Sequence, residues 1–315
     1  MNFLQSLNES PIIITEGSVV ERLRRDSLFP LDPHIANAGF IYKPEQKAAL
    51  KKIYTEYIEI GRAKNLPIIL FTPTWRANPE RLKLAGLDKK DMNGDCYRFL
   101  DEIRKEYGPY ASRIFIGGLM GCKGDAYKPG EALGSDAAAI FHQIQSHALA
   151  QAGVDFLFAA TLPAFSEALG MAKAMSKTGI PYILSFVVRA EGTLLDGTPL
   201  HEAIVKIDSS ILPKPLGFMV NCVHPSVFQQ AISSEENSSE FVRQRILGLQ
   251  ANTSKKRPEE LDGSAALDTE DPEVFGELMI GLNKKFGMKI LGGCCGTNGR
   301  HIEAIAKKSK LSVEH

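Results

Sequence analysis

The chain has 315 residues, of which 44% are hydrophobic and 23% charged, and its 37 basic side chains balance its 37 acidic ones. This composition is that of an ordinary globular protein, and the zero net charge gives no indication of nucleic acid or of an anionic membrane as a partner. No apolar run reaches the roughly 18 residues of a membrane-spanning helix, and residues 1–6 lack the basic and apolar regions of a secretory signal.

Eight short apolar runs recur along the chain and are predicted to be β-strands. Several are continuously apolar rather than alternating, which is typical of parallel strands buried on both faces. The runs are residues 11–17, 67–75, 113–121, 156–163, 181–188, 217–224, 245–252 and 289–296.

The segments between these runs carry helical patterns. Apolar residues at helical spacing predict a helix that buries one face, comprising Leu50, Ile53, Tyr54, Tyr57 and Ile58. Ser135 is predicted to cap a helix that presents Ile140 and Ile144 on one face and ends near Gly153.

Two further helices are predicted near the end of the chain. Asp271 followed by Pro272 indicates a helix start, and Gly287 is predicted to close that helix. Its apolar stripe comprises Phe275, Leu278, Met279, Leu282 and Phe286. Residues 301–309 are predicted to form a final helix, and the polar segment 233–239 a surface loop.

Eight alternations of strand and helix in about 300 residues match a (β/α)₈ TIM barrel, which typically takes about 250 residues plus insertions. An open doubly wound sheet is the alternative, but it does not need eight strands. No repeat, low-complexity tract or linker divides the sequence, so we expect residues 1–315 to form a single domain.

Three cysteines follow predicted strands. Cys294 and Cys295 are adjacent in the segment GGCCGT after the eighth run, and Cys222 lies at the end of the sixth. Neighbouring cysteines are poorly placed for a structural disulfide, whose Cα atoms lie roughly 4.4–6.8 Å apart. In a closed barrel all three lie around one mouth, where such enzymes place their chemistry. Three thiolates there suit Zn²⁺ with an open fourth position.

Alternatives to this metal site remain open. Glycine and cysteine are also small residues that pack a tight strand end. Cys122, after the third strand, is a candidate for a fourth ligand of a closed structural site, and Cys96 in a predicted helix is interpreted as an inert core residue. The odd total of five cysteines favours a reducing setting, so we expect a cytoplasmic protein with free or metal-bound thiols.

A zinc ion held by three thiolates has a net charge of −1 and is a poor Lewis acid for hydrolysis. It can instead hold an incoming thiol as thiolate at neutral pH, although a free thiol has a pKa of about 8.5. The predicted reaction is therefore attack of a thiolate on an activated alkyl group.

These motifs resemble the homocysteine S-methyltransferase family over nearly the whole chain. The resemblance rests on the segment from Asn221 to Cys222, on GGCCGT, and on shorter matches at residues 16–23, 72–75, 124–127, 153–156, 185–186 and 252–254. It implies a TIM barrel with zinc on Cys222, Cys294 and Cys295, and methylation of homocysteine to methionine. Donors in the family include S-methylmethionine, S-adenosylmethionine, betaine and methylcobalamin.

The resemblance also implies a set of substrate-binding positions, some of which depart from the family pattern. They are Glu16, Gly17, Ser18, Trp75, Arg76, Ala160, Thr161 and Asn221. Glu16 and Ser18 stand where the family usually has Asp and Gly. Ala160 stands where it has a Glu that binds the amino group of homocysteine. The loss of this carboxylate is expected to weaken substrate binding unless Glu16 or Glu167 replaces it. Glu167 is more simply interpreted as part of a helix first turn capped by Ser166.

Other side chains at the predicted mouth have two interpretations each. Trp75 either stacks on an onium donor or covers the core at the rim, and Arg76 either clamps a carboxylate or is a solvated loop residue. His142 and His147 are interpreted as structural, whereas His301 is a candidate for supporting the cysteines.

We therefore expect a zinc-dependent S-methyltransferase acting on homocysteine. The alternatives are transfer to a different thiol acceptor, or a non-catalytic protein that binds zinc or a thiol. The expected partners are a small thiol and a small methyl donor, or a separate methyl-carrier protein, without nucleic acid or membrane. Because no long extension follows the final predicted helix, a monomer is expected.

Overall fold

In the computed structural model, eight parallel strands close into a barrel in chain order, with β8 pairing back to β1. The structure describes residues 1–26, 29–257, 260 and 269–311. The strands are β1 Ile13–Thr15, β2 Ile68–Phe71, β3 Ile114–Met120, β4 Phe156–Leu162, β5 Tyr182–Phe186, β6 Gly217–Asn221, β7 Ile246–Ala251 and β8 Ile290–Gly293. Each predicted run contains one of them, and the predicted TIM barrel is confirmed.

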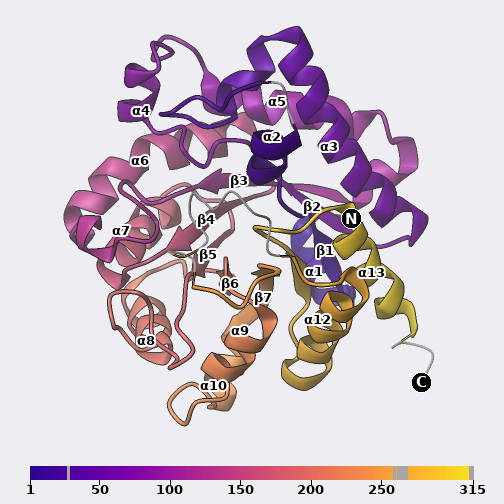
Figure 1. Cartoon of the computed structure of the whole chain (residues 1–315). Helices are drawn as coiled ribbons and strands as arrows, with labels where there is room; N and C mark the ends of the chain where they lie inside the picture. Colours follow the sequence, from indigo (N-terminus) through magenta and orange to yellow (C-terminus); the bar gives the residue numbers. More distant parts are fainter. Residues whose placement is uncertain (27–28, 258–259, 261–268, 312–315) are drawn as a thin grey trace.

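Helices form a ring around the strands (Figure 1). The α-helices are α1 Phe3–Glu9, α2 Val20–Asp26, α3 Pro44–Ala63, α4 Pro79–Leu84, α5 Met92–Lys105, α6 Ser135–Ala152, α7 Phe165–Ser176, α8 Leu200–Ser210, α9 Pro225–Ile232, α10 Glu240–Arg245, α12 Pro272–Phe286 and α13 Gly299–Leu311. The short 3₁₀ helices within the described residues are η1 Ala38–Tyr42, η2 Gly108–Arg113 and η3 Pro129–Glu131. None of the helices described is long and apolar enough to span a bilayer.

Aromatic side chains fill the barrel at the amino ends of its strands. Phe3 of α1 stacks on Phe156 with ring centroids 4.1 Å apart and meets Phe115 edge-on at 5.5 Å. In the next layer toward the carboxyl ends of the strands, the ring centroids of Phe71 and Phe158 lie 4.5 Å apart. This packing closes one end of the barrel, so small molecules reach its interior from the other end.

Most of the predicted helical features are confirmed. All five residues of the α3 stripe are buried, and Asp271 caps α12, which Gly287 ends in a left-handed conformation. The α6 helix does end at Gly153 in the left-handed region.

The prediction for α6 was wrong at its start and on its outer face. Gly134, not Ser135, precedes the helix, and Ile140 and Ile144 are 74% and 62% exposed. The inner face carries Ala138 instead, because α6 and α7 approach so closely that a Cβ at Gly170 would lie 2.4 Å from that of Ala138. A branched side chain has no room there.

Candidate metal centre and substrate cavity

Three thiols meet at the carboxyl ends of β6 and β8. Cys222 follows β6, Cys294 and Cys295 follow β8, and their three sulfur atoms all lie within 4.8 Å of one another. Zinc bound tetrahedrally at about 2.3 Å holds its sulfur ligands about 3.8 Å apart, so the donor set fits this ion. Cys122 and Cys96 are buried elsewhere, Cys122 against the Gly124 carbonyl at 3.6 Å and Cys96 within α5.

The glycines before the cysteine pair allow close contact with neighbouring segments. A Cβ at Gly292 would lie 1.8 Å from Thr15 Oγ1, and one at Gly293 would lie 2.2 Å from Thr297 Oγ1. Thr297 in turn donates to the Cys294 carbonyl at 2.7 Å and accepts from the Ser18 amide at 3.0 Å. The cysteine segment is thus fastened to the loop after β1.

Two asparagines hold the cysteine segments in place. Asn252, after β7, donates to the Cys222 carbonyl at 2.9 Å and accepts from the Cys295 amide at 3.1 Å. Asn221 donates to the Cys222 sulfur at 3.2 Å and to Thr161 Oγ1 at 2.7 Å. Cys222 and Thr161 both have φ near 60°, which non-glycine residues rarely adopt and which is often found at functional sites.

The three thiols share their protons unequally. Cys222 Sγ lies 2.8 Å from Cys294 Sγ. Hydrogen bonds from Cys294 and then Cys295 lower the pKa of Cys222 well below that of an ordinary thiol. Donating to Cys222 raises the pKa of the other two. These shifts favour the thiolate form of Cys222, which is the form of cysteine that binds a metal cation.

The thiols line a cavity of about 270 Å³ at the mouth of the barrel. Its walls include every predicted substrate-binding position except Arg76, namely Glu16, Gly17, Ser18, Trp75, Ala160, Thr161 and Asn221. Arg76 lines a neighbouring cavity instead. Much of the wall opposite the thiols is apolar, formed by Phe71, Trp75, Leu119 and Ala160.

Glu16 is a carboxyl group buried in this cavity wall. Its Oε2 accepts from the Phe71 amide at 2.9 Å, and the residue is 7% exposed. Burial raises the pKa of Glu16 well above its usual value, and the single amide bond offsets only part of this. Burial therefore favours the protonated form of this carboxyl group.

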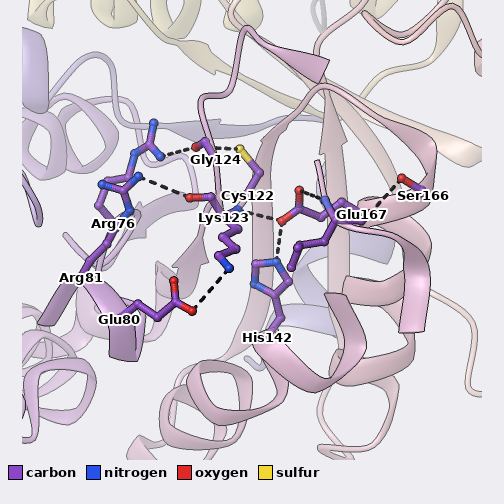
Figure 2. A network of polar contacts seen from close by, with 10 residues as sticks. Arg76, Glu80, Arg81, Cys122, Lys123, Gly124, His142, Ser166 and Glu167 are labelled. Carbon is purple, nitrogen blue, oxygen red and sulfur yellow. Dashed lines mark hydrogen bonds and ion pairs between the residues drawn. The ribbon is translucent and has the colours of Figure 1, made fainter. Parts of the chain in front are cut away.

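Glu167 does not face the cavity. Its Oε1 accepts from the Lys123 amide at 2.7 Å and lies 2.8 Å from His142 Nε2, and its Oε2 accepts from the Leu133 amide at 3.2 Å (Figure 2). The carboxylate thus fastens two loops to α7. Ser166 was predicted to cap this helix, but Ala164 occupies that position and Ser166 donates to the Leu133 carbonyl at 2.9 Å.

The histidines are structural in the contacts described. His301 bonds the Glu270 carbonyl at 3.1 Å and Asn298 at 3.0 Å, and within the described part of the chain it makes no hydrogen bond to a cysteine sulfur. Burial lowers the pKa of His301. His147 bonds the Gln143 carbonyl within its own helix at 3.0 Å.

Two residues of the site escaped sequence-based reasoning. Glu21 of α2 accepts from the Gly296 amide, next to the cysteine pair. Tyr127 lies against Cys222, and burial followed by the charge of that thiol raises the pKa of Tyr127 well above its usual value. Their spacing from the cysteines in the sequence, more than 90 residues in each case, gives no signal of this proximity.

Comparison with known proteins agrees with this architecture. The family model described as homocysteine S-methyltransferase matches residues 13–309. The homocysteine S-methyltransferase of Escherichia coli K12 is 23% identical over 323 residues, covering 96% of this chain and 97% of the relative. Rat betaine–homocysteine S-methyltransferase 1 is 22% identical, covering 97% of this chain and 74% of the relative.

A solved structure shows the same fold. The metallated form of the homocysteine methyltransferase MmuM from Escherichia coli superposes with a TM-score of 0.75 at 20% identity, over 96% of this chain and 98% of that one. The closed barrel, the three converging thiols and the family match over residues 13–309 lead to one conclusion. The chain belongs to the homocysteine S-methyltransferase family, a family of methyltransferases.

Proposed function

We propose that residues 1–315, acting as a single domain, transfer a methyl group to the thiol of homocysteine and release methionine, with Zn²⁺ held by Cys222, Cys294 and Cys295. The observation that carries the proposal is the convergence of three thiols on the wall of a closed-ended cavity. When bound, zinc supplies a position at which an incoming thiol is held as thiolate near neutral pH.

The chain's own residues set up the reaction around that position. Asn221 donates to the Cys222 sulfur, and Asn252 joins the Cys222 carbonyl to the Cys295 amide, so both ligand segments are held in one arrangement. Hydrogen bonds to metal-ligating residues orient the ligands and tune their basicity. The enclosing wall of Phe71, Leu119 and Ala160 excludes water from the attacking sulfur.

The transfer is a single displacement at carbon. The acceptor thiol releases its proton to solvent as it binds, its sulfur forms a bond to the methyl carbon, and the bond between that carbon and the donor breaks with its electron pair staying on the donor. Alignment of sulfur, carbon and leaving group contributes several kcal/mol in such reactions. A donor with a positive onium centre is favoured because Trp75 offers an aromatic face in the same cavity.

A second candidate keeps this chemistry but changes the acceptor to a thiol without an ammonium group. Ala160 offers no carboxylate to an ammonium group, and Glu167 is bonded to two backbone amides away from the cavity. Glu16 also lines the cavity, and burial raises its pKa well above the usual value. This shift disfavours the carboxylate form with which an ammonium group would pair.

An acceptor panel tests both candidates. Reduced protein loaded with zinc is supplied with S-methylmethionine, S-adenosylmethionine or betaine, together with homocysteine or 4-mercaptobutanoate, and methylated products are identified by mass spectrometry. Turnover of homocysteine supports the first candidate, and turnover of 4-mercaptobutanoate alone supports the second. Turnover that persists in Cys222→Ser, with Cys122→Ser as the matched control, contradicts both.

A further inference from the structure

A second cavity, of about 420 Å³, adjoins the thiol cavity and shares Trp75 and Tyr127 with it. Its basic wall is formed by Arg76, after β2, and Arg81 of α4. Figure 2 shows both guanidinium groups directed toward the segment from Cys122 to Gly124, which follows β3. The function proposed above makes no use of this cavity.

Both guanidinium groups are anchored by carbonyl oxygens. Arg76 donates to the Gly124 carbonyl at 2.6 Å, while Arg81 donates to those of His34 and Lys123 at 3.2 and 3.3 Å. Within residues 1–26, 29–257, 260 and 269–311, neither has a carboxylate at ion-pair distance. Burial and the nearby charge of Arg76 lower the pKa of Arg81, and the charges of Cys122 and Glu80 offset only part of this.

The acidic residues of the same cavity are occupied by other groups. Asp32 accepts from the amides of His34 and Ile35, at 2.8 and 3.0 Å. Asp125 accepts from the Tyr127 amide at 2.9 Å and lies 3.5 Å from Lys128 Nζ. Glu131 accepts from the Asp125 amide at 2.9 Å. These contacts shape the loops, and none of them is an ion pair with Arg76 or Arg81.

Stacking fixes the position of Arg76. Its guanidinium carbon lies 4.2 Å from the centroid of the Trp75 ring, and the indole packs against Gly121, where a Cβ would lie 2.6 Å from Trp75 Nε1. A stacked guanidinium anchored to one carbonyl is a preorganised fork whose remaining N–H groups match a carboxylate.

We propose that Arg76 and Arg81 form a subsite for the carboxylate of a small-molecule substrate that extends past Trp75 toward the thiols. A carboxylate fits better than a phosphate dianion because Asp32, Asp125 and Glu131 line the same cavity and repel a second negative charge. Only the statement that this molecule takes part in methyl transfer rests on the proposed function. The anion subsite itself stands on the geometry of the second cavity.

Trp75 provides a direct readout because it is the single tryptophan of the chain and Arg76 covers its ring. Sodium 4-(methylthio)butanoate is titrated into the full chain while indole fluorescence is recorded, and the neutral 4-(methylthio)butanamide and inorganic phosphate are titrated in parallel. The acid is expected to bind at least about 10-fold more tightly than the amide, which corresponds to one charge-assisted pair.

Variants of Arg76 test whether this residue causes the difference in affinity between acid and amide. Arg76→Gln is expected to remove the difference between acid and amide, and Arg76→Lys to restore part of it, since lysine keeps the charge without the fork. Arg113→Gln is the matched control: Arg113 also donates to a carbonyl, that of Asn65 at 3.0 Å, but precedes β3 at the opposite end of the barrel. It is expected to bind both probes like the unsubstituted chain.

Three results overturn the proposal: equal binding of acid and amide, the absence of a saturable signal with either probe, or tighter binding of phosphate than of the acid. The unsubstituted chain alone gives these results, so they do not depend on how a variant folds. Repeating the titration with Cys222→Ser separates the two proposals. Binding of the acid that is retained in Cys222→Ser supports the subsite independently of the thiols, whereas methyl transfer that persists in this variant speaks against the proposed function alone.

Discussion

The two sides of the barrel mouth are built differently. The side formed by the loops after β6, β7 and β8, here called the thiol side, is held by directional hydrogen bonds, with Asn221 and Asn252 as their centre. The side formed by Phe71, Trp75, Leu119 and Ala160, here called the apolar side, has Glu16 as the carboxyl group beside it.

This contrast separates two properties of the protein. Each cysteine segment of the thiol side has at least one partner from another strand end. Under the proposed function, this side therefore sets the geometry of the metal ligands and with it the type of reaction. The apolar side carries little charge, so it selects substrates mainly by the shape of the cavity. Changes on the thiol side should therefore abolish turnover, and changes on the apolar side should shift preference between substrates.

Metal removal is expected to have the largest effect. Dialysis of reduced protein against a strong chelator should lower the rate of methyl transfer on the order of 1,000-fold. Without the metal, several kcal/mol of charge stabilisation are lost from the reaction, which corresponds to about three factors of ten in rate. Adding back zinc should restore the rate. A rate unchanged after verified metal removal would show that the thiol side does not act through a metal.

Asn252→Ala should weaken metal binding by about 10- to 100-fold, as is typical when a group that orients ligands is lost. Competition with a chromophoric chelator measures this directly. Asn93→Ala is the control, because Asn93 is also a buried asparagine but bonds Ala77 and Gln145 away from the thiols. Equal metal affinities in the two variants would contradict the role assigned to Asn252.

Ala160→Glu tests the apolar side. A carboxylate at this cavity-lining position should raise kcat/KM for homocysteine relative to 4-mercaptobutanoate by about 10-fold, equivalent to about 1.4 kcal/mol for one ammonium contact. Steady-state assays with both acceptors at one pH measure the ratio. A ratio that stays constant would mean that the acceptor's ammonium group does not lie beside residue 160.

Glu16→Gln should have the smallest effect, on stability as a function of pH. The raised pKa of Glu16 means that the native chain keeps a proton that the unfolded chain releases above about pH 4.3, so the free energy of unfolding falls as pH rises. Glutamine does not titrate, so near pH 8 the variant should have a free energy of unfolding about 1–3 kcal/mol higher than the unsubstituted chain, which is the cost of burying a poorly satisfied group. Near pH 4 the two free energies of unfolding should be equal.

Urea denaturation at several pH values measures this difference. Glu167→Gln is the comparison, because Glu167 accepts from two backbone amides and its replacement should destabilise the protein. A Glu16→Gln variant that is less stable near pH 8 would show that the carboxyl group of Glu16 is ionised in the native state.

Much of the barrel could be predicted from the sequence because parallel strands buried on both faces are continuous apolar runs. The three cysteines could be brought together for the same reason, since the ends of parallel strands share one mouth. Loop conformation is not encoded in such patterns. The contacts of Glu21 with Gly296 and of Arg76 with Gly124 depend on how segments fold back, as does the placement of Arg76 outside the thiol cavity.

The orientation of α6 shows a second limit of prediction from the sequence. Ile140 and Ile144 are spaced as a core stripe, yet they are exposed, and at Ala138 the close approach of α6 and α7 near Gly170 admits only a small side chain. Pairwise packing of this kind depends on two helices at once, and periodicity within one of them does not show it.

Metal content measured by elemental analysis, on protein purified under reducing conditions, tests the central claim most directly. The full chain should contain about one zinc ion per molecule, as should Cys122→Ser, whose sulfur lies outside the cluster. Cys222→Ser should contain almost none. A reduced full chain without bound metal, or a Cys222→Ser variant that retains it, would contradict a zinc centre on these three thiols.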